Sequence, residues 1–151
     1  MFLCFGVEAK SFYLIRHAEK LNDGSKDPVL TLKGQLRAQN IAHILSHTGI
    51  TKVFATEYQR TQMTAKPMAD LIGVNVTSYN PSDLLAFAEQ MHAQDESVLI
   101  VGHSNTTPQL VKLLSGEPVI KLTEADFDYI FQVVIEEGQT SLNILKSLPV
   151  H

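Results

Sequence analysis

The sequence is poor in cysteine, tryptophan and long apolar runs, and it carries no excess of positive charge. Cys4 is the only cysteine, which excludes an intramolecular disulfide and a cysteine-based metal cage. No segment approaches the ~18 apolar residues of a membrane span. The formal net charge of −4 argues against a broad nucleic-acid surface, because proteins that bind the phosphate backbone carry basic patches. Any anionic ligand would have to be met by a few local cations.

The composition that remains is that of an ordinary globular chain. Hydrophobic residues make up 44% and charged residues 19% of the 151 residues, a length that suits one domain. We predict one domain over residues 11–151, preceded by an N-terminal extension over residues 1–10. The first nine residues are apolar and end in Val-Glu-Ala before Lys10, a pattern like a signal-peptidase site. They lack a basic n-region and a long apolar core. Both a cytoplasmic protein with an irregular N-terminus and an exported (periplasmic) protein with the remnant of an export signal therefore stay open.

Short apolar runs alternate with amphipathic segments along the chain. Buried strands are predicted at residues 11–15, 51–55, 74–79 and 97–101. Helices are predicted after a cap at Thr31, over residues 58–72, after an Asn80-Pro81 start and from Pro108 to Leu114. Apolar runs at 129–135 and 140–146 predict a hairpin. This order predicts an α/β fold, a three-layer αβα sandwich with a mostly parallel central sheet and a C-terminal antiparallel hairpin.

Cations and imidazoles follow three of the predicted strands. Arg16 and His17 follow the first strand, Arg60 follows the second, and His103 follows the strand at 97–101. Because parallel strands of one sheet point the same way, these residues converge at one edge. Guanidinium forks suit phosphate oxygens, and a neutral imidazole can attack phosphorus to form a phosphohistidine. We therefore predict that Arg16, Arg60 and His103 hold a phosphoryl group while His17 attacks it.

The same segments resemble the histidine phosphatase superfamily, the phosphoglycerate-mutase-like fold. The run Leu14-Ile15-Arg16-His17-Ala18-Glu19 resembles its Arg-His-Gly-Glu signature. Residues 55–65 resemble its second arginine segment, residues 99–105 its second histidine segment, and residues 27–38 its stretch into the first helix. The resemblance covers residues 11–146. It implies a metal-independent enzyme without a cofactor, a phosphohistidine at His17, and the short phosphatase branch of the family.

Two residues depart from the family pattern, and one of them leaves the general acid unassigned. Ala18 replaces the usual glycine, and Ser104 stands where the acid-phosphatase branch has its proton-donating aspartate. The candidate acids are Asp83, which follows the third strand, and Glu19, which lies nearest the nucleophile but could serve a structural ion pair. Glu89, in the middle of a predicted helix, is a weaker candidate, and another group or water is the remaining alternative.

The residues that follow the second histidine are candidates for substrate binding. Ser104 and Asn105 lie directly after His103, and Asn105 either donates to the phosphate or caps the helix that follows. The segment also comes close to the Gly-x-Ser-x-Gly elbow of serine hydrolases, with Ser104 as nucleophile. Thr106 stands in place of the last glycine, and the only later histidine is His151.

The predicted activity is that of a phosphatase acting on a phosphomonoester or on phosphohistidine. The predicted partner is a small phosphorylated substrate or a phosphohistidine protein, and the sequence indicates no oligomeric state. A mutase is disfavoured, because the short chain offers little that would shield a phosphoenzyme from water. The alternatives are a non-catalytic module of the same fold that binds a phosphorylated ligand, and a serine hydrolase that uses Ser104.

Overall fold

The strands form one mixed sheet whose central members are parallel. The computed structural model describes residues 9–151 and orders six strands as β3-β2-β4-β1-β5-β6. The parallel strands are β1 (Lys10–Arg16), β2 (Ile50–Ala55), β3 (Val76–Ser78) and β4 (Ser97–Gly102). The antiparallel strands are β5 (Tyr129–Glu136), which pairs with β1, and β6 (Gln139–Lys146), which pairs with β5. The predicted C-terminal hairpin is confirmed.

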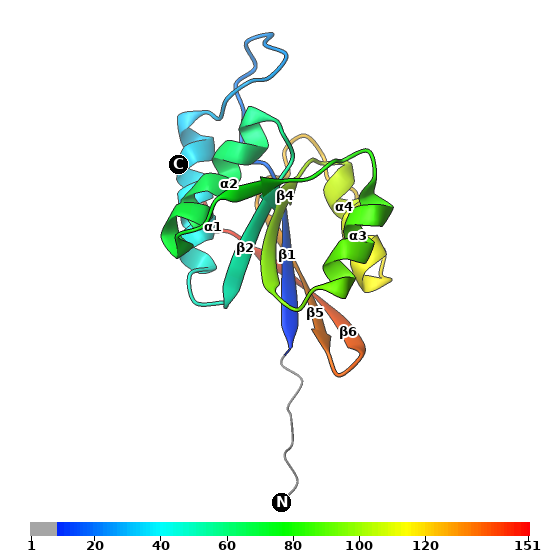
Figure 1. Ribbon diagram of the computed structural model, residues 1–151. Coiled ribbons are helices and arrows are strands. Elements are labelled where there is room, and N and C mark those ends of the chain that lie inside the picture. Colours follow the sequence, from blue (N-terminus) through cyan, green and yellow to red (C-terminus); the bar gives the residue numbers. More distant parts are fainter. Residues whose placement is uncertain (1–8) are drawn as a thin grey trace, which may run out of the picture.

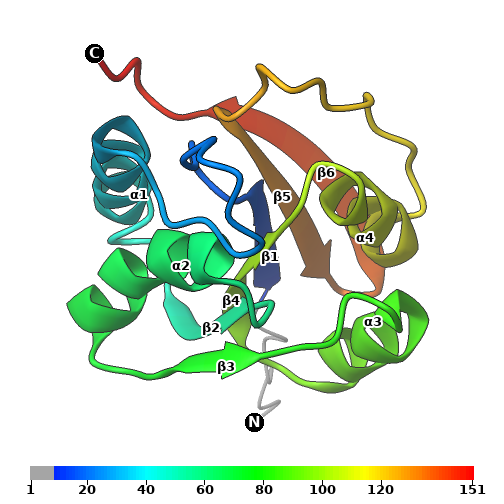
Figure 2. The ribbon, with the colours of Figure 1, turned by 90° about the horizontal axis from the view of Figure 1, so that it is seen from above.

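Helices cover both faces of this sheet (Figures 1 and 2). One face carries α1 (Leu32–Ile44) and α2 (Gln59–Ile72), and the other carries α3 (Leu84–Ala93) and α4 (Thr106–Ser115). The side chains of β1 alternate between the two layers, as the period of a strand requires. Phe12 and Leu14 pack in the core beneath α3 and α4, whereas Tyr13 and Ile15 pack beneath α1 and α2. The predicted αβα sandwich is confirmed.

The starts of α1 and α4 follow the rules for unpaired N–H groups in the first helical turn. Thr31 caps α1 as predicted, because its Oγ1 accepts from Gly34 N at 3.0 Å. The helix expected to open at Pro108 begins two residues earlier, at Thr106. Proline fits there because the first four N–H groups of a helix need no intrahelical acceptor.

The predicted start of α3 at Asn80 is wrong. Asn80 Oδ1 accepts from Ser82 N at 2.9 Å and so closes a local turn ahead of the helix. The cap is Asp83, whose Oδ1 accepts from Ala86 N at 3.2 Å. Aspartate and asparagine are equally good caps, so the two positions cannot be separated by residue type alone.

The N-terminal extension divides between residues inside and outside the described chain. Residues 1–8, which carry most of the predicted export-signal remnant, lie outside it. Lys10, predicted to belong to the extension, is the first residue of β1, and its Nζ donates to Gln94 O at 2.6 Å and to His92 O at 2.8 Å. Within residues 9–151, no helix is long and apolar enough to cross a membrane.

Candidate functional site

A cavity of about 430 Å³ lies at the carboxyl ends of β1 and β4, and we call it the basic cavity. Six residues predicted to form the site line it: Arg16, His17, Arg60, His103, Ser104 and Asn105. Its other lining residues were not predicted: Lys20, Tyr58, Pro81, Ser82, Thr106 and Glu124. The structure therefore brings the proposed nucleophile and the proposed phosphate ligands together from three strand ends.

His17 is buried, with 4% of its surface exposed, and its ring orientation is fixed. Its Nδ1 lies 2.8 Å from Ala18 O, and its backbone N–H donates to Gly102 O at 2.9 Å. Since a carbonyl oxygen only accepts, Nδ1 carries the proton and Nε2 keeps its lone pair. The pKa of His17 is lowered to about 3, chiefly by burial and also by the charge of Arg16, against the Ala18 hydrogen bond that raises it. The imidazole is therefore neutral at physiological pH.

Ala18 fits its position without the freedom of a glycine. Its side chain is fully buried in a small cluster with Leu30 and Ala38, and its N–H donates to Thr64 Oγ1 at 2.9 Å. Among the described residues that are not glycine, Glu137 alone has a positive φ. The replacement of glycine by Ala18 therefore brings no backbone strain to the loop that follows His17.

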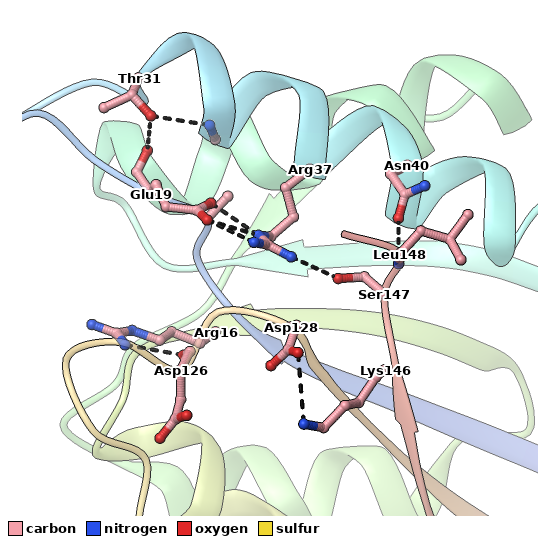
Figure 3. Close-up of polar contacts among 12 residues, drawn as sticks. Arg16, Glu19, Thr31, Arg37, Asn40, Asp126, Asp128, Lys146, Ser147 and Leu148 are labelled. Carbon is pink, nitrogen blue, oxygen red and sulfur yellow. Dashed lines mark hydrogen bonds and ion pairs between the residues drawn. The ribbon is translucent and has the colours of Figure 1, made fainter. Parts of the chain in front are cut away.

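Arg16 is held by a turn that lies far away in the sequence. Its Nη1 donates to Thr123 O at 2.9 Å and to Asp126 O at 3.1 Å, a contact drawn in Figure 3. Its Cζ lies 4.1 Å from the centre of the Phe127 ring, and its Nη2 lies 3.6 Å from Glu124 Oε2. The turn is closed by the Asp126 carboxylate, which accepts from the N–H and the hydroxyl of Thr123 at 2.7 and 2.8 Å. Sequence reasoning missed this turn, because no local pattern links it to Arg16.

Arg60 and His103 form a second pair that is oriented by neighbouring side chains. Arg60 Cζ lies 4.4 Å from the Tyr58 ring centre, and its Nη2 lies 3.5 Å from His103 Nδ1. A guanidinium only donates, so Nδ1 accepts and Nε2 donates to Thr56 Oγ1 at 2.9 Å. Burial, and then the charges of Arg60 and Arg16, lower the pKa of His103 to about 4. Like His17, His103 is neutral at physiological pH.

Two buried donors at this site lack an acceptor. The Nε atoms of Arg16 and Arg60 are buried and have no hydrogen-bond partner in the described chain. An unsatisfied buried donor costs ~1–3 kcal/mol, and more when it is charged. Because both arginines line the basic cavity, an anion with several acceptor oxygens is the ligand best suited to this arrangement.

The candidate general acids Glu19 and Asp83 are engaged elsewhere. Glu19 accepts from Nε and Nη2 of Arg37 at 2.7–3.0 Å, and Arg37 Nη1 donates to Ser147 Oγ at 2.9 Å (Figure 3). Burial raises the pKa of Glu19, but the hydrogen bonds from Arg37, a backbone hydrogen bond and the charges of Arg37 and Lys33 together lower the pKa below its ordinary value. Asp83 caps α3 and lines a different cavity. Neither carboxylate lines the basic cavity, whose one lining carboxylate is that of Glu124, beside Arg16.

The two residues after His103 lie at the start of α4. Asn105 occupies the cap position, but its side chain makes no capping hydrogen bond. Thr106 Oγ1 instead accepts from His103 N at 3.0 Å. Of the two roles predicted for Asn105, the side chain does not perform the helix cap. In the described chain, no hydrogen bond joins Ser104 Oγ to a histidine, as the serine-hydrolase alternative would require.

The sequence of the chain matches known proteins over its first half. Residues 12–80 match the model of the histidine phosphatase superfamily, branch 1. A probable phosphoglycerate mutase GpmB from Enterobacter sp. (strain 638) is 37% identical over 70 residues, which cover 42% of this chain and 33% of that protein. The same protein from Erwinia tasmaniensis is 37% identical over the same shares. The match therefore spans about a third of these relatives.

Solved structures match over nearly the whole chain, at low sequence identity. The protein histidine phosphatase SixA, in complex with tungstate, has a TM-score of 0.72 at 20% identity and covers 90% of this chain and 96% of its own. A mycobacterial glucosyl-3-phosphoglycerate phosphatase has a TM-score of 0.72 at 15% identity and covers 93% of this chain and 100% of its own. These likenesses concern the fold. Over residues 12–80, the predicted resemblance to the histidine phosphatase superfamily, branch 1, is confirmed.

Proposed function

We propose that the protein is a phosphatase that cleaves a phosphomonoester through a phosphohistidine on His17. The observation that carries the proposal is the state of His17, which lines the basic cavity with Nδ1 bound to Ala18 O and Nε2 free. A neutral imidazole with a fixed free nitrogen is an activated nucleophile. The two arginines beside it, with their unpartnered Nε groups, supply the charge that a phosphoryl group requires.

The reaction has two displacements. His17 Nε2 attacks phosphorus, the bond between phosphorus and the leaving oxygen breaks, and the electron pair leaves with that oxygen, which takes a proton from solvent. Water then attacks the phosphohistidine and gives one proton to solvent, the P–N bond breaks with its electron pair returning to Nε2, and inorganic phosphate leaves with neutral His17 restored. Arg16 and Arg60 stabilise the charge on the phosphoryl oxygens in both steps. His103 is held by Thr56 at 2.9 Å. Because its imidazole is neutral, it offers no positive charge to the phosphoryl group and instead orients Arg60.

The carboxylates near the site favour a leaving group that departs with little help from an acid. Glu19 is bound to Arg37 and Asp83 caps α3, while Glu124 Oε2 lies 3.6 Å from Arg16 Nη2. A general acid raises the reaction rate by ~10²–10⁴-fold. A phosphoramidate such as phosphohistidine depends less on a general acid than an alkyl phosphate does. Phosphohistidine, the substrate named for the structurally similar SixA, is therefore the second candidate substrate.

Hydrolysis of p-nitrophenyl phosphate by the wild type and by His17→Ala tests the proposal. We expect the wild type to release phosphate and to give an acid-labile phosphoenzyme on rapid quenching, and we expect His17→Ala to do neither. Arg60→Ala should lower kcat/KM by about 10²-fold or more, because a charge-stabilising donor is lost. Equal rates for wild type and His17→Ala would contradict the mechanism.

The alternative of a binding module without turnover makes the opposite prediction. Such a protein would bind inorganic phosphate or vanadate in the basic cavity and release no phosphate from any ester. Binding that is lost in Arg16→Ala, together with no turnover in the wild type, would support this alternative. Inhibition by a fluorophosphonate but not by vanadate would support the serine-hydrolase alternative.

A further inference from the structure

A second, larger cavity adjoins the basic cavity. It has a volume of about 780 Å³, within the range of ~300–1,000 Å³ that is typical of small-molecule sites. Tyr58, Pro81 and Ser82 line both cavities, so the two share a wall. A substrate whose phosphoryl group lies beside His17 can therefore extend its leaving group past Tyr58 into the second cavity.

The two cavities differ in the sign of their charge. The charged residues of the basic cavity are three cations and one carboxylate: Arg16, Lys20, Arg60 and Glu124. The charged residues of the second cavity are one cation and two carboxylates: Lys26, Asp27 and Glu57. The potential therefore changes from positive to negative along the path from the phosphoryl group to the leaving group.

Three segments of the chain build this second cavity. Lys26 and Asp27 come from the loop between β1 and α1, which projects above the sheet edge in Figure 1. Residues 57–58 follow β2, Ser78 ends β3, and residues 79–82 follow it. The loop is tied to α2, because Asp27 Oδ1 accepts from Gln59 N at 2.9 Å and Asp27 O accepts from Gln59 Nε2 at 3.0 Å. One wall of the cavity is therefore held in place by hydrogen bonds. Glu57, another lining residue, is exposed and forms no ion pair within residues 9–151.

We infer that the second cavity receives the leaving group of a small phosphomonoester, and that it selects a neutral or cationic leaving group over an anionic one. The inference rests on the proposed phosphatase function and specifies its substrate class. An amino alcohol or a polyhydroxy compound meets carboxylates and hydroxyl groups there. A carboxylate or a second phosphate on the leaving group meets Glu57 and Asp27, and like charges repel.

Two phosphomonoesters of matched size test the charge preference. Phosphoethanolamine carries an ammonium two carbons from the phosphate, and phosphoglycolate carries a carboxylate at the same place. We expect the wild type to favour phosphoethanolamine in kcat/KM, and Glu57→Lys to reduce that preference by about ten-fold, since it replaces one charge by its opposite. Glu57→Gln should reduce it by about three-fold. Glu117→Lys, an equal change at an exposed residue that follows α4 and lines neither cavity, should leave the ratio at the wild-type value.

Two further measurements separate this inference from the proposed function. Hydrolysis of p-nitrophenyl phosphate by the wild type tests the phosphatase function by itself, and its absence would contradict that function alone. Dissociation constants of the two matched compounds with His17→Ala report the charge preference without turnover. A wild-type preference for phosphoglycolate, or a preference that Glu57→Lys leaves unchanged, would overturn the inference.

Discussion

Two neutral imidazoles beside two guanidinium groups are the feature of single residues on which the proposed chemistry depends. Burial lowers the pKa of His17 to about 3 and that of His103 to about 4, against ~6.5 for an unperturbed imidazole. Each is also held in one tautomer by a neighbour with a single hydrogen-bonding role: Ala18 O only accepts from His17 Nδ1, and Arg60 Nη2 only donates to His103 Nδ1. The site therefore holds a nucleophile in its reactive form. Because the buried histidines resist protonation, the same arrangement lowers the free energy of unfolding at low pH.

The pH dependence of stability measures that cost. The unfolded chain binds protons on both histidines as the pH falls through about 6.5, whereas the folded chain does not bind them until about pH 3–4. Between these values the unfolded state binds more protons, so the free energy of unfolding falls as the pH falls. We expect urea unfolding between pH 7.0 and about 4.5 to show this loss, and His103→Asn to remove part of it.

A control variant keeps this measurement specific. His43 is exposed on α1, so His43→Asn should lose stability with falling pH as the wild type does. Equal pH dependences in the wild type, His103→Asn and His43→Asn would mean that the site histidines take up protons in the folded state as readily as in the unfolded state.

At the scale of helices and strands, local patterns predicted the elements that bring the proposed ligands together. Short β-forming runs that end abruptly in polar residues located β1, β2 and β4 to within one residue, and the parallel direction of the strands then placed Arg16, Arg60 and His103 at one edge. The start of α3 was misplaced, because Asn80 and Asp83 carry equal capping signals and their choice depends on packing.

Long-range contacts account for what the sequence did not predict at the site. Arg16 is oriented by Thr123 and Asp126, 107 and 110 residues away along the chain, and neither residue type nor spacing encodes such a contact. Tyr58 is different, because it lies within the segment that resembles the family's second arginine motif. An aromatic ring two residues before Arg60 is a signal that could have been used.

The first turn of α1 packs directly on the loop that follows His17, and Gly34 makes this approach possible. A Cβ at Gly34 would lie 2.2 Å from Glu19 O and 3.0 Å from Glu19 N, both backbone atoms. Although alanine favours a helix over glycine by ~1 kcal/mol, we expect Gly34→Ala to lower the free energy of unfolding by about 1–3 kcal/mol, because the backbone must shift. Urea denaturation measures the loss.

The neighbouring residue supplies the control. Gln35→Ala changes an exposed side chain in the same helical turn and should alter the free energy of unfolding by no more than ~0.5 kcal/mol. Since Glu19 lies two residues beyond His17, Gly34→Ala should also lower kcat. A stabilised Gly34→Ala variant would show that the loop yields to the added methyl group without cost.

At the scale of the whole molecule, Arg37 connects three distant parts of the chain. Its guanidinium joins the loop after β1, through Glu19, to the segment after β6, through Ser147 (Figure 3). The same C-terminal segment is held on α1 by Leu148 N, which donates to Asn40 Oδ1 at 3.0 Å. Through Arg37, Glu19 at the end of the signature motif thus connects the sheet edge to α1 and to the C-terminal segment, which explains why Glu19 is engaged away from the basic cavity.

The burial of this ion pair decides what its loss costs. Arg37 and Glu19 approach to 2.7 Å with side chains 8% and 15% exposed, whereas Lys52 and Glu96 approach to the same 2.7 Å with side chains 49% and 43% exposed. Removing one partner of a buried pair leaves an uncompensated charge and costs ~3–5 kcal/mol, whereas an exposed pair contributes ~0–1 kcal/mol.

We expect Arg37→Met to lower the free energy of unfolding by about 3 kcal/mol and Lys52→Met by less than about 1 kcal/mol, as measured by urea denaturation at pH 7. The double variant Arg37→Met/Glu19→Gln should recover part of the lost free energy of unfolding, because it removes the buried carboxylate that Arg37→Met leaves without a cation. Equal losses in Arg37→Met and Lys52→Met would mean that water reaches Glu19 freely and that the three segments are joined by packing alone.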